Sequence, residues 1–325
     1  MTLSKDSDGE VVKYDTIVVG GSFAGLAAAL YLARARRKVA VFDTGEPRNR
    51  FSAHSHGVFA IDGKPGPELL EAARSQLTKY PTARLFRKKV ISATRMDDSL
   101  FEVETEENDF SQSRRLVLAT GVVDQFPKIP GFQELWGKKV FHCPYCDGYG
   151  ISGGNLGVIA TLPISLHYSS IISDWGEVTL FTNRSISLDA QAKDVARRRK
   201  IKIVEQKVAR LEENSSDGAV TIVLDDDSKV CVKAVFALTP VKIASYHLAQ
   251  GLDCAFTSAP RGEKIKTDEW RMTSVSGVYA IGDISRPHHS ISLATADGVT
   301  AALGIHQSLI SEEERGMRTE RVSKS

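Results

Sequence analysis

Two cysteines three positions apart carry the most reactive chemistry in this sequence. The segment reads Cys143-Pro-Tyr-Cys146 and is followed directly by Asp147. Such a pair indicates either redox chemistry or half of a zinc site. Zinc requires four ligands, and neither a second Cys-x-x-Cys pair nor a spaced histidine pair accompanies this one. A redox role is therefore favoured, with the thiol pKa lowered at a helix start, and no metal site is expected.

The other two cysteines, Cys231 and Cys254, stand alone. Cys231 belongs to residues 229–237, where alternation followed by an apolar run is typical of a buried strand. Because free cysteine is among the most buried residue types, we expect both side chains to be small buried hydrophobes.

Length and charge limit the class of protein. The 325 residues predict about two domains, and 42 Lys and Arg against 40 Asp and Glu give a formal charge of +2. This balance gives no reason to expect nucleic acid or an anionic membrane as partner. No apolar run approaches the ~18 residues of a membrane span, and residues 1–13 lack the apolar core of a secretory leader. A cytoplasmic protein is expected.

A glycine-rich turn follows the first apolar strand. Residues 14–19 are mostly β-branched and apolar, the turn reads Gly20-Gly-Ser-Phe-Ala-Gly25, and residues 26–36 continue with helix-forming Ala and Leu. A second strand, residues 38–43, ends in an acid. This order is typical of a dinucleotide-binding unit.

Each position of that unit has a physical reason. Gly20 permits the tight turn, and Gly25 permits close packing of the helix on the strand. Ser22 takes the middle glycine position, where a small side chain is tolerated beside a phosphate. The pyrophosphate would lie at the helix N-terminus, and Asp43 would accept a hydrogen bond from a ribose hydroxyl.

The remaining elements predict an α/β fold with two Rossmann-like dinucleotide-binding domains, the second inserted into the first. A buried strand closes at Thr120-Gly121, and another at residues 277–283 precedes a helix over 293–309. Between them lie a strand at 156–160, a helix at 163–174, a strand at 177–181 and a hairpin at 219–235. We expect a first domain from 1–123 and 242–325, with a frayed charged tail from 311, and an inserted domain over 124–241 that carries the cysteine pair.

In their order and spacing, these motifs resemble the low-molecular-weight thioredoxin reductases, a class of two-domain flavoproteins. The resemblance covers residues 14–309 and rests on the turn at 20–25, Ala119-Thr-Gly121, Cys143-Pro-Tyr-Cys-Asp-Gly148 and residues 277–283. The loop Gly45-Glu-Pro-Arg-Asn-Arg50 also resembles that of shorter bacterial and fungal relatives.

The resemblance implies an FAD enzyme with a redox-active disulfide between Cys143 and Cys146, and a homodimer. Cys146 would lie against the flavin, Cys143 would attack the partner's disulfide, and Asp147 would move the proton of the interchange thiol. Asp147 could instead be a helix N-terminal acid that interacts with the macrodipole. His289-Ser290 replaces the family's Arg-Gln beside the flavin, so helix-start amides near Ile291 are expected there. The residues expected to hold FAD are Gly20, Gly21, Ser22, Phe23, Ala24, Gly25, Asp43, Thr120, Gly121, Gly282, Asp283 and Ile291.

The second domain departs from the family at its own phosphate turn. Its first strand leads into Ala160-Thr-Leu-Pro-Ile-Ser165, which has no glycine, and the basic cluster after the next strand is reduced to Arg184. Leu162 would place a branched side chain where the backbone must approach a pyrophosphate. NADPH is therefore not expected as a cofactor.

Without NADPH, the sequence looks closest to the deeply rooted and ferredoxin-dependent thioredoxin reductases. We expect it to reduce thioredoxin or a similar disulfide, with ferredoxin as donor. Residues 197–200 and 87–89 are candidate basic docking segments, although solvated surface charge is the more ordinary interpretation. The alternatives are a dithiol oxidase that passes electrons to O₂ and a flavin-binding sensor without turnover. The retained cysteine pair argues against the sensor.

Overall fold

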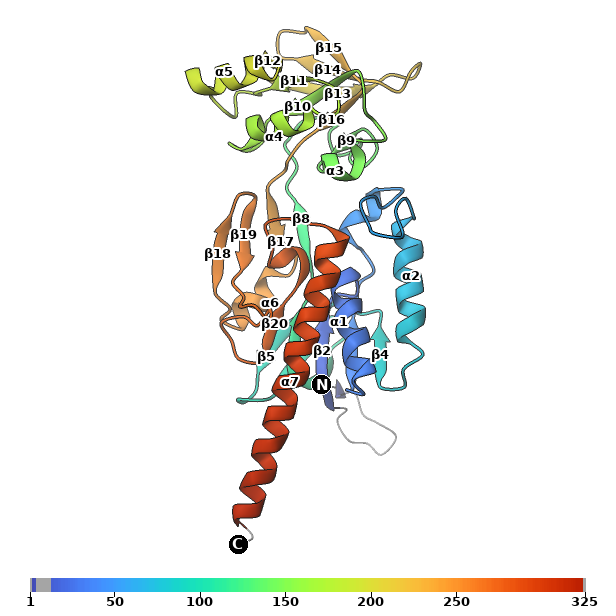
Figure 1. Ribbon diagram of the computed structural model, residues 1–325, viewed down its shortest axis with the longest axis vertical. Coiled ribbons are helices and arrows are strands. Elements are labelled where there is room, and N and C mark those ends of the chain that lie inside the picture. Colours follow the sequence, from blue (N-terminus) through green and yellow to red (C-terminus); the bar gives the residue numbers. More distant parts are fainter. Residues whose placement is uncertain (1, 4–12, 324–325) are drawn as a thin grey trace.

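The computed structural model describes residues 2–3 and 13–323 (Figure 1). Residues 4–12 lie outside the described residues. They belong to the segment 1–13, in which the sequence shows no apolar core of a secretory leader. Two α/β units are stacked along the long axis of the molecule, and the chain passes between them through β8 and β17 (Figure 1). The α/β class predicted from the sequence is confirmed. None of the described helices is both long and apolar enough to cross a bilayer.

The lower unit in Figure 1 is built on an eight-stranded sheet. Strands β4, β3, β2, β7, β6 and β5 follow one another in that order, and β1 and β20 also pair with β7. The pairs β2–β3, β2–β7, β3–β4 and β20–β7 are parallel. The strands are β1 (Thr2–Leu3), β2 (Lys13–Val19), β3 (Val39–Phe42), β4 (Ala83–Phe86), β5 (Val90–Arg95), β6 (Phe101–Thr105), β7 (Asp109–Leu118) and β20 (Val278–Ala280).

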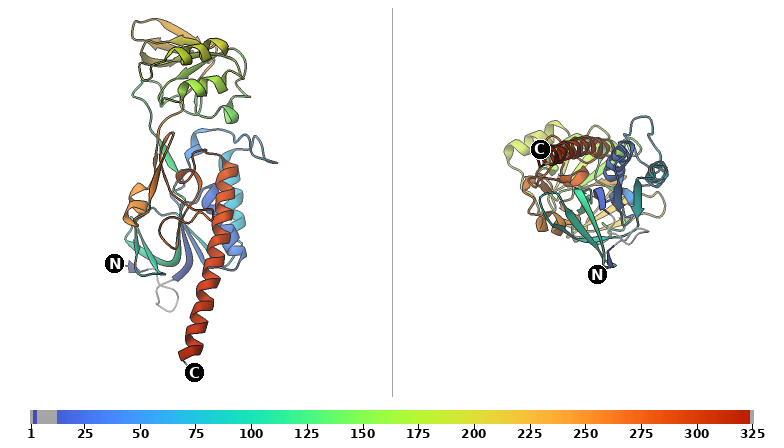
Figure 2. Two further views of the ribbon diagram at one scale, coloured as in Figure 1. Left: turned by 60° about the vertical axis from the view of Figure 1, so that its left-hand side comes forward. Right: turned by 90° about the horizontal axis from the view of Figure 1, so that it is seen from below.

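Side chains alternate between two cores on either side of this sheet. On β2, Ile17 and Val19 belong to one buried cluster and Val18 to the other, as the two-residue period of a strand requires. Helices α1 and α7 lie together on the second face (Figures 1 and 2). The helices of this unit are α1 (Phe23–Arg34), α2 (Gly66–Leu77), α6 (Tyr246–Gly251), α7 (Ile291–Ser323) and the 3-10 turns η1 (Arg48–Phe51) and η2 (Gly282–Ile284); the strands β18 (Phe256–Ala259) and β19 (Gly262–Ile265) form a hairpin.

The upper unit contains a parallel five-stranded sheet in the order β12-β11-β10-β16-β9. An antiparallel sheet, β13-β14-β15, covers one side of it. The elements are β9 (Val140–Phe141), α3 (Pro144–Asp147), β10 (Asn155–Ile159), α4 (Ser165–Ile172), β11 (Glu177–Phe181), α5 (Ala190–Arg198), β12 (Lys202–Val204), β13 (Val208–Glu213), β14 (Val220–Leu224), β15 (Lys229–Val232) and β16 (Ala234–Phe236).

The outgoing and returning segments between the units run side by side. β8 (Val122–Asp124) pairs antiparallel with β17 (Val241–Ile243). Beyond this pair, the amide of Gln125 donates to the carbonyl of Pro240. Both connections therefore cross between the units at one place, below and to the left of α3 in Figure 1.

The prediction of a frayed tail is wrong over the described residues. α7 continues from Ile291 to Ser323 and extends past the end of the sheet (Figure 2). Glu312 accepts from Arg114 at 3.1 Å, and Glu313 accepts from Arg37 at 2.7 Å. These pairs hold the charged turns of α7 against the edge of the lower unit, and residues 324–325 lie outside the described residues.

Of the two lone cysteines, one was predicted correctly. Cys254 is buried, with its Sγ 3.6 Å from the hydroxyl oxygen of Thr273. Cys231 is exposed on β15, which contradicts the expectation of a buried side chain. Val230 and Val232, on either side of it, pack against the core of the upper unit, so strand alternation places Cys231 on the solvent side of the outer sheet.

Candidate redox site between the two units

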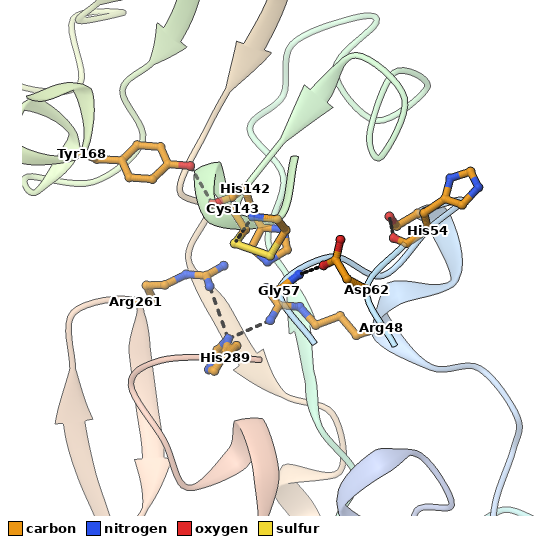
Figure 3. The surroundings of a disulfide bond; sticks show 11 residues. Arg48, His54, Gly57, Asp62, His142, Cys143, Tyr168, Arg261 and His289 are labelled. Carbon is orange, nitrogen blue, oxygen red and sulfur yellow. Dashed lines mark hydrogen bonds between the residues drawn. A yellow bond between two sulfur atoms is a disulfide. The ribbon is translucent and has the colours of Figure 1, made fainter. Parts of the chain in front are cut away.

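Cys143 and Cys146 form a disulfide at the start of α3, on the side of the upper unit that faces the lower one (Figures 1 and 3). Cys143 is the N-cap residue, and its Sγ accepts from the amide of Cys146 at 3.2 Å. Pro144 supplies the first helical position, where its missing amide hydrogen costs nothing. The two cysteines lie three positions apart, about one helical turn, which brings their side chains to the same side of the helix start.

Asp147 closes α3 and is half-buried. Burial raises the pKa of its carboxyl to about 6, although the nearby His56 acts in the opposite direction. The carboxyl therefore changes protonation close to neutral pH, as a group that exchanges a proton with a thiol must.

His142 fixes the chain just before the disulfide. Its ring stacks on Trp136 at 5.8 Å between centroids, and its carbonyl accepts from the hydroxyl of Tyr168 at 2.6 Å. Burial and the guanidinium groups of Arg48 and Arg261 lower the pKa of His142 well below its ordinary value, so the imidazole is neutral.

A buried carboxylate, Asp124 at the end of β8, lies below the disulfide. It accepts from Arg48 Nε and Nη2 at 2.8 and 2.7 Å, and from Arg261 Nη2 at 2.9 Å. The hydroxyl of Thr239, on the returning segment, donates to it at 2.7 Å. The side chain of Asp124 is only 6% exposed, and the paired arginines hold its pKa far below the usual range despite burial. This Asp124 clamp fixes both connecting segments to the lower unit.

The clamp continues to the loop before α7 through His289 (Figure 3). Arg48 Nη1 and Arg261 Nη1 lie 2.7 and 3.3 Å from His289 Nδ1. Because guanidinium groups only donate, Nδ1 is the acceptor, and the ring hydrogen lies on Nε2, which donates to the carbonyl of Arg286. Burial, opposed by Asp283, lowers the pKa of His289 to about 4, so the ring is neutral. Arg48 also pairs with Asp283 at 3.0 Å.

The glycine turn of the lower unit has the shape that the sequence predicts. Gly20 has a φ of +110°, and a Cβ there would overlap the carbonyl of Ala119. A Cβ on Gly25 would overlap the carbonyl of Gly20. The N-cap Ser22 makes no side-chain cap hydrogen bond, and the first turn of α1 contains no acid. The N-terminus of α1 is thus open to an anion.

The other predicted cofactor residues lie at the carboxyl ends of the central strands. Asp43 follows β3 and accepts from the amide of Gly21 at 3.1 Å. Thr120 and Gly121 follow β7, beside the glycine turn. The expected residues of the C-terminal segment are Gly282 and Asp283 in η2, and Ile291 at the first position of α7.

The corresponding turn of the upper unit is closed by its own side chain. Ser165 Oγ accepts from the amides of Thr161 and Leu162, both at 3.3 Å. Thr161 donates its hydroxyl hydrogen to the carbonyl of Leu238. Arg184, the remaining cation after β11, pairs with Asp225 at 2.8 Å. Two amides and the cation that could face a phosphate therefore already have protein partners.

Both candidate basic segments carry internal counter-charges. Arg197 and Arg198 pair with Asp194, and Lys88 pairs with Asp109 and Glu107. Neither segment is a free cationic face, which agrees with the more ordinary interpretation. Two tyrosines close to the cysteines in the sequence are open to solvent: Tyr145 is 71% exposed and Tyr149 is 89% exposed.

Sequence reasoning missed the Asp124 clamp. In the sequence, Arg48 belongs to the recognised loop at 45–50, but no motif marks Asp124 or Arg261 as functional. Asp124 lies 76 positions from Arg48 and 137 from Arg261, so no local spacing connects them. An acid directly after a short apolar segment at the predicted crossing point was the one available signal.

Comparisons with known proteins agree with this arrangement. The "Thioredoxin reductase tcpT" of Claviceps purpurea is 35% identical over 283 residues, which cover 83% of this chain and 86% of that protein. The "Thioredoxin reductase aclD" of Aspergillus oryzae is 29% identical over 93% of this chain and 98% of its own. The crystal structure of an oxidoreductase from Agrobacterium tumefaciens superposes with a TM-score of 0.88 at 37% identity, covering 92% of this chain and 99% of that one.

Residues 14–298 match the family described as pyridine nucleotide-disulphide oxidoreductase, and the chain is a thioredoxin reductase-like member of that family.

Proposed function

We propose that this protein is an FAD-dependent dithiol–disulfide oxidoreductase that reduces thioredoxin or a similar disulfide with electrons from a donor other than NADPH. The observation that carries the proposal is the turn after β10, where Ser165 occupies the amides of Thr161 and Leu162. A pyrophosphate would have to displace that hydroxyl and would meet Leu162 in place of a glycine. Ferredoxin, a one-electron protein donor that needs no such turn, is the expected donor.

The residues of the lower unit fit FAD. The open N-terminus of α1 suits the pyrophosphate, and Gly20 and Gly25 leave no room for a Cβ. Asp43 at the tip of β3 suits the adenosine ribose, and Asp283 the ribityl chain. We expect Asp283→Asn to retain less flavin through purification, measured as the ratio of flavin to protein absorbance; an unchanged ratio would remove Asp283 from the site.

The chain's own residues then divide the chemistry. Bound FAD supplies an electron pair to the disulfide. Cys143, the N-cap residue of α3, is the thiol that attacks the substrate disulfide, and Cys146 displaces the reduced product as the internal disulfide re-forms. Asp147 exchanges the proton of the interchange thiol.

We further propose the domain roles and the assembly. Residues 1–123 and 242–325 form the FAD domain, and residues 124–241 form a pyridine-nucleotide-like domain whose phosphate turn has degenerated. Exposed apolar side chains recur along α7 at Leu303, Ile310 and Met317; this seven-residue spacing supports a homodimer that packs two such helices. Two unpaired cysteines, Cys231 and Cys254, support a cytoplasmic location.

The donor is tested by anaerobic absorbance titration of the flavin-loaded protein, first with NADPH and then with chemically reduced ferredoxin. We expect bleaching of the flavin only with ferredoxin, followed by one equivalent of thioredoxin disulfide reduced per electron pair. Stoichiometric bleaching by micromolar NADPH would refute the interpretation that the turn at 160–165 does not bind NADPH. Cys143→Ser and Cys146→Ser serve as controls, because each should abolish disulfide turnover while flavin stays bound.

A second candidate is oxidation of small dithiols with transfer of electrons to O₂. It is favoured by the exposed rings of Tyr145, which lies between the two cysteines in the sequence, and of Tyr149, three residues after them, because they offer apolar surface to a small molecule. Bleaching by small dithiols alone, with hydrogen peroxide formed when air is admitted, would place this candidate first.

A further inference from the structure

A cavity of about 440 Å³ lies in the upper unit, away from the redox disulfide. Its wall is built where the parallel strands begin: Lys139 precedes β9, Asn155 opens β10 and Ala234 opens β16. Cys143 follows the other end of β9. The cavity therefore lies at the amino ends of the parallel strands, and the disulfide follows the carboxyl end of one of them. The volume lies within the roughly 300–1,000 Å³ typical of small-molecule sites.

Three lysines line this cavity, and their charges are poorly matched by acids. Lys138 is exposed, and its ammonium has no hydrogen-bond or ion-pair partner among the described residues. Lys233 donates to the carbonyl of Ser152 at 2.8 Å, a neutral group that leaves its charge in place. Lys139 pairs with Glu213 at 4.0 Å, a long ion pair. Asp217, the one acid in the wall, accepts from the amide of Ala219.

A thiol stands in the same wall. Cys231 is exposed on β15, and it lines the cavity together with Lys233, which stands at the bend between β15 and β16. Its Sγ accepts a hydrogen bond from Asn214 Nδ2 at 3.7 Å. The cavity thus combines a reachable sulfur, apolar contact from Phe141 and Ile151, and an excess of positive charge.

We propose that this cavity binds a small disulfide carrying several carboxylates and that Cys231 forms a mixed disulfide with it. The thiolate of Cys231 attacks one sulfur of the bound disulfide, the S–S bond breaks, and the other half leaves as a thiolate that takes up a proton. Electrons balance because one disulfide bond replaces another and no further oxidant is needed. The modification is separate from the turnover at Cys143 and Cys146.

The test compares two disulfides on the flavin-loaded protein with its internal disulfide intact. Glutathione disulfide is the anionic probe, and 2-hydroxyethyl disulfide is the neutral one. Each rate at Cys231, read by peptide mass mapping, is divided by the rate of the same reagent with N-acetylcysteine. We expect the normalised rate to favour glutathione disulfide by about tenfold at 20 mM salt and by less than about twofold at 0.5 M, because salt screens the attraction.

Matched variants separate the cavity from general surface charge. Lys138→Gln removes one exposed charge from the wall, whereas Lys229→Gln removes one exposed charge from the same strand face as Cys231 but outside the cavity. We expect a several-fold loss of the anionic preference in the first variant and little change in the second, with no labelling in Cys231→Ser. Equal rates for the two reagents, or equal effects of the two lysine variants, would overturn the proposal.

Discussion

At the scale of single residues, the chemistry depends on the burial of one carboxyl beside a reactive pair. Asp147 lies directly after Cys146 in α3, and burial raises its pKa to about 6. The form that accepts a proton is the carboxylate, which is populated above that pH. A half-reaction in which a thiol gives up its proton to Asp147 should therefore accelerate as pH rises through about 6.

Asp147→Asn tests this role. Asparagine keeps the shape but cannot accept the proton, so we expect the rate of disulfide exchange to fall by about 10²–10⁴-fold. The rise of the rate near pH 6 should also disappear from the pH–rate profile of this variant. Stopped-flow absorbance measures both effects. A variant that is slower but retains the same limb would assign the proton transfer to another group.

The sequence supports inference at this scale only where residues are neighbours along the chain. The cysteine pair, Asp147 and the glycine turn could be recognised because a short motif contains all the partners. The Asp124 clamp could not, since its three charged members come from three distant segments. The prediction for Cys231 failed because residue type was weighed above strand position: Val232 faces the core, so its neighbour faces solvent.

At the scale of elements, α7 shows how charge can lengthen a helix. A run rich in Glu and Arg predicts fraying when considered alone, because it has no apolar face. Two acids of that run, Glu312 and Glu313, instead form ion pairs with Arg37 and Arg114, which lie about 200 or more positions earlier in the sequence. Long-range ion pairs of this kind leave no periodic pattern, which is why the extent of α7 was underestimated while the strands and most helices were found.

Glu313 allows this account to be measured. Hydrogen bonds from Arg37 and Arg114 lower its pKa to about 2, so its contribution to stability is complete above about pH 4.5 and is lost as pH falls towards 2. The side chain is 35% exposed, so we expect Glu313→Gln to cost about 1 kcal/mol or less at pH 7. Urea unfolding at several pH values should show this difference vanish in acid. A constant difference across pH would mean that the carboxylate charge is not its source.

At the scale of the whole molecule, one buried carboxylate links the two units and fixes how one is oriented on the other. Asp124 and Thr239 belong to the outgoing and returning segments, and Arg48 and Arg261 belong to the lower unit. The two-domain layout could be inferred from the order of strands and turns. The orientation of one unit on the other depends on these contacts, which only the folded structure brings together.

Asp124→Asn should loosen that orientation. It removes the carboxylate that pairs with the buried Arg261 and one of the two carboxylates that pair with Arg48, so we expect a loss of about 3–5 kcal/mol in the free energy of unfolding. Calorimetry should also resolve separate transitions for the two units. Asp98→Asn, which breaks the exposed pair with Arg95, is the control and should change stability by less than about 0.5 kcal/mol. A loss below 1 kcal/mol for Asp124→Asn would show that other contacts join the units.

The pairing of β8 with β17 has a consequence for modularity. Because Asp124 and Val241 are direct partners across this pair, a short hairpin turn could connect them and omit everything between. The eight-stranded sheet, its glycine turn and η2 would all remain. We expect such a shortened chain to keep binding FAD while losing all disulfide chemistry, measured by flavin content after purification. Failure to retain flavin would show that the lower unit is not an autonomous cofactor-binding module.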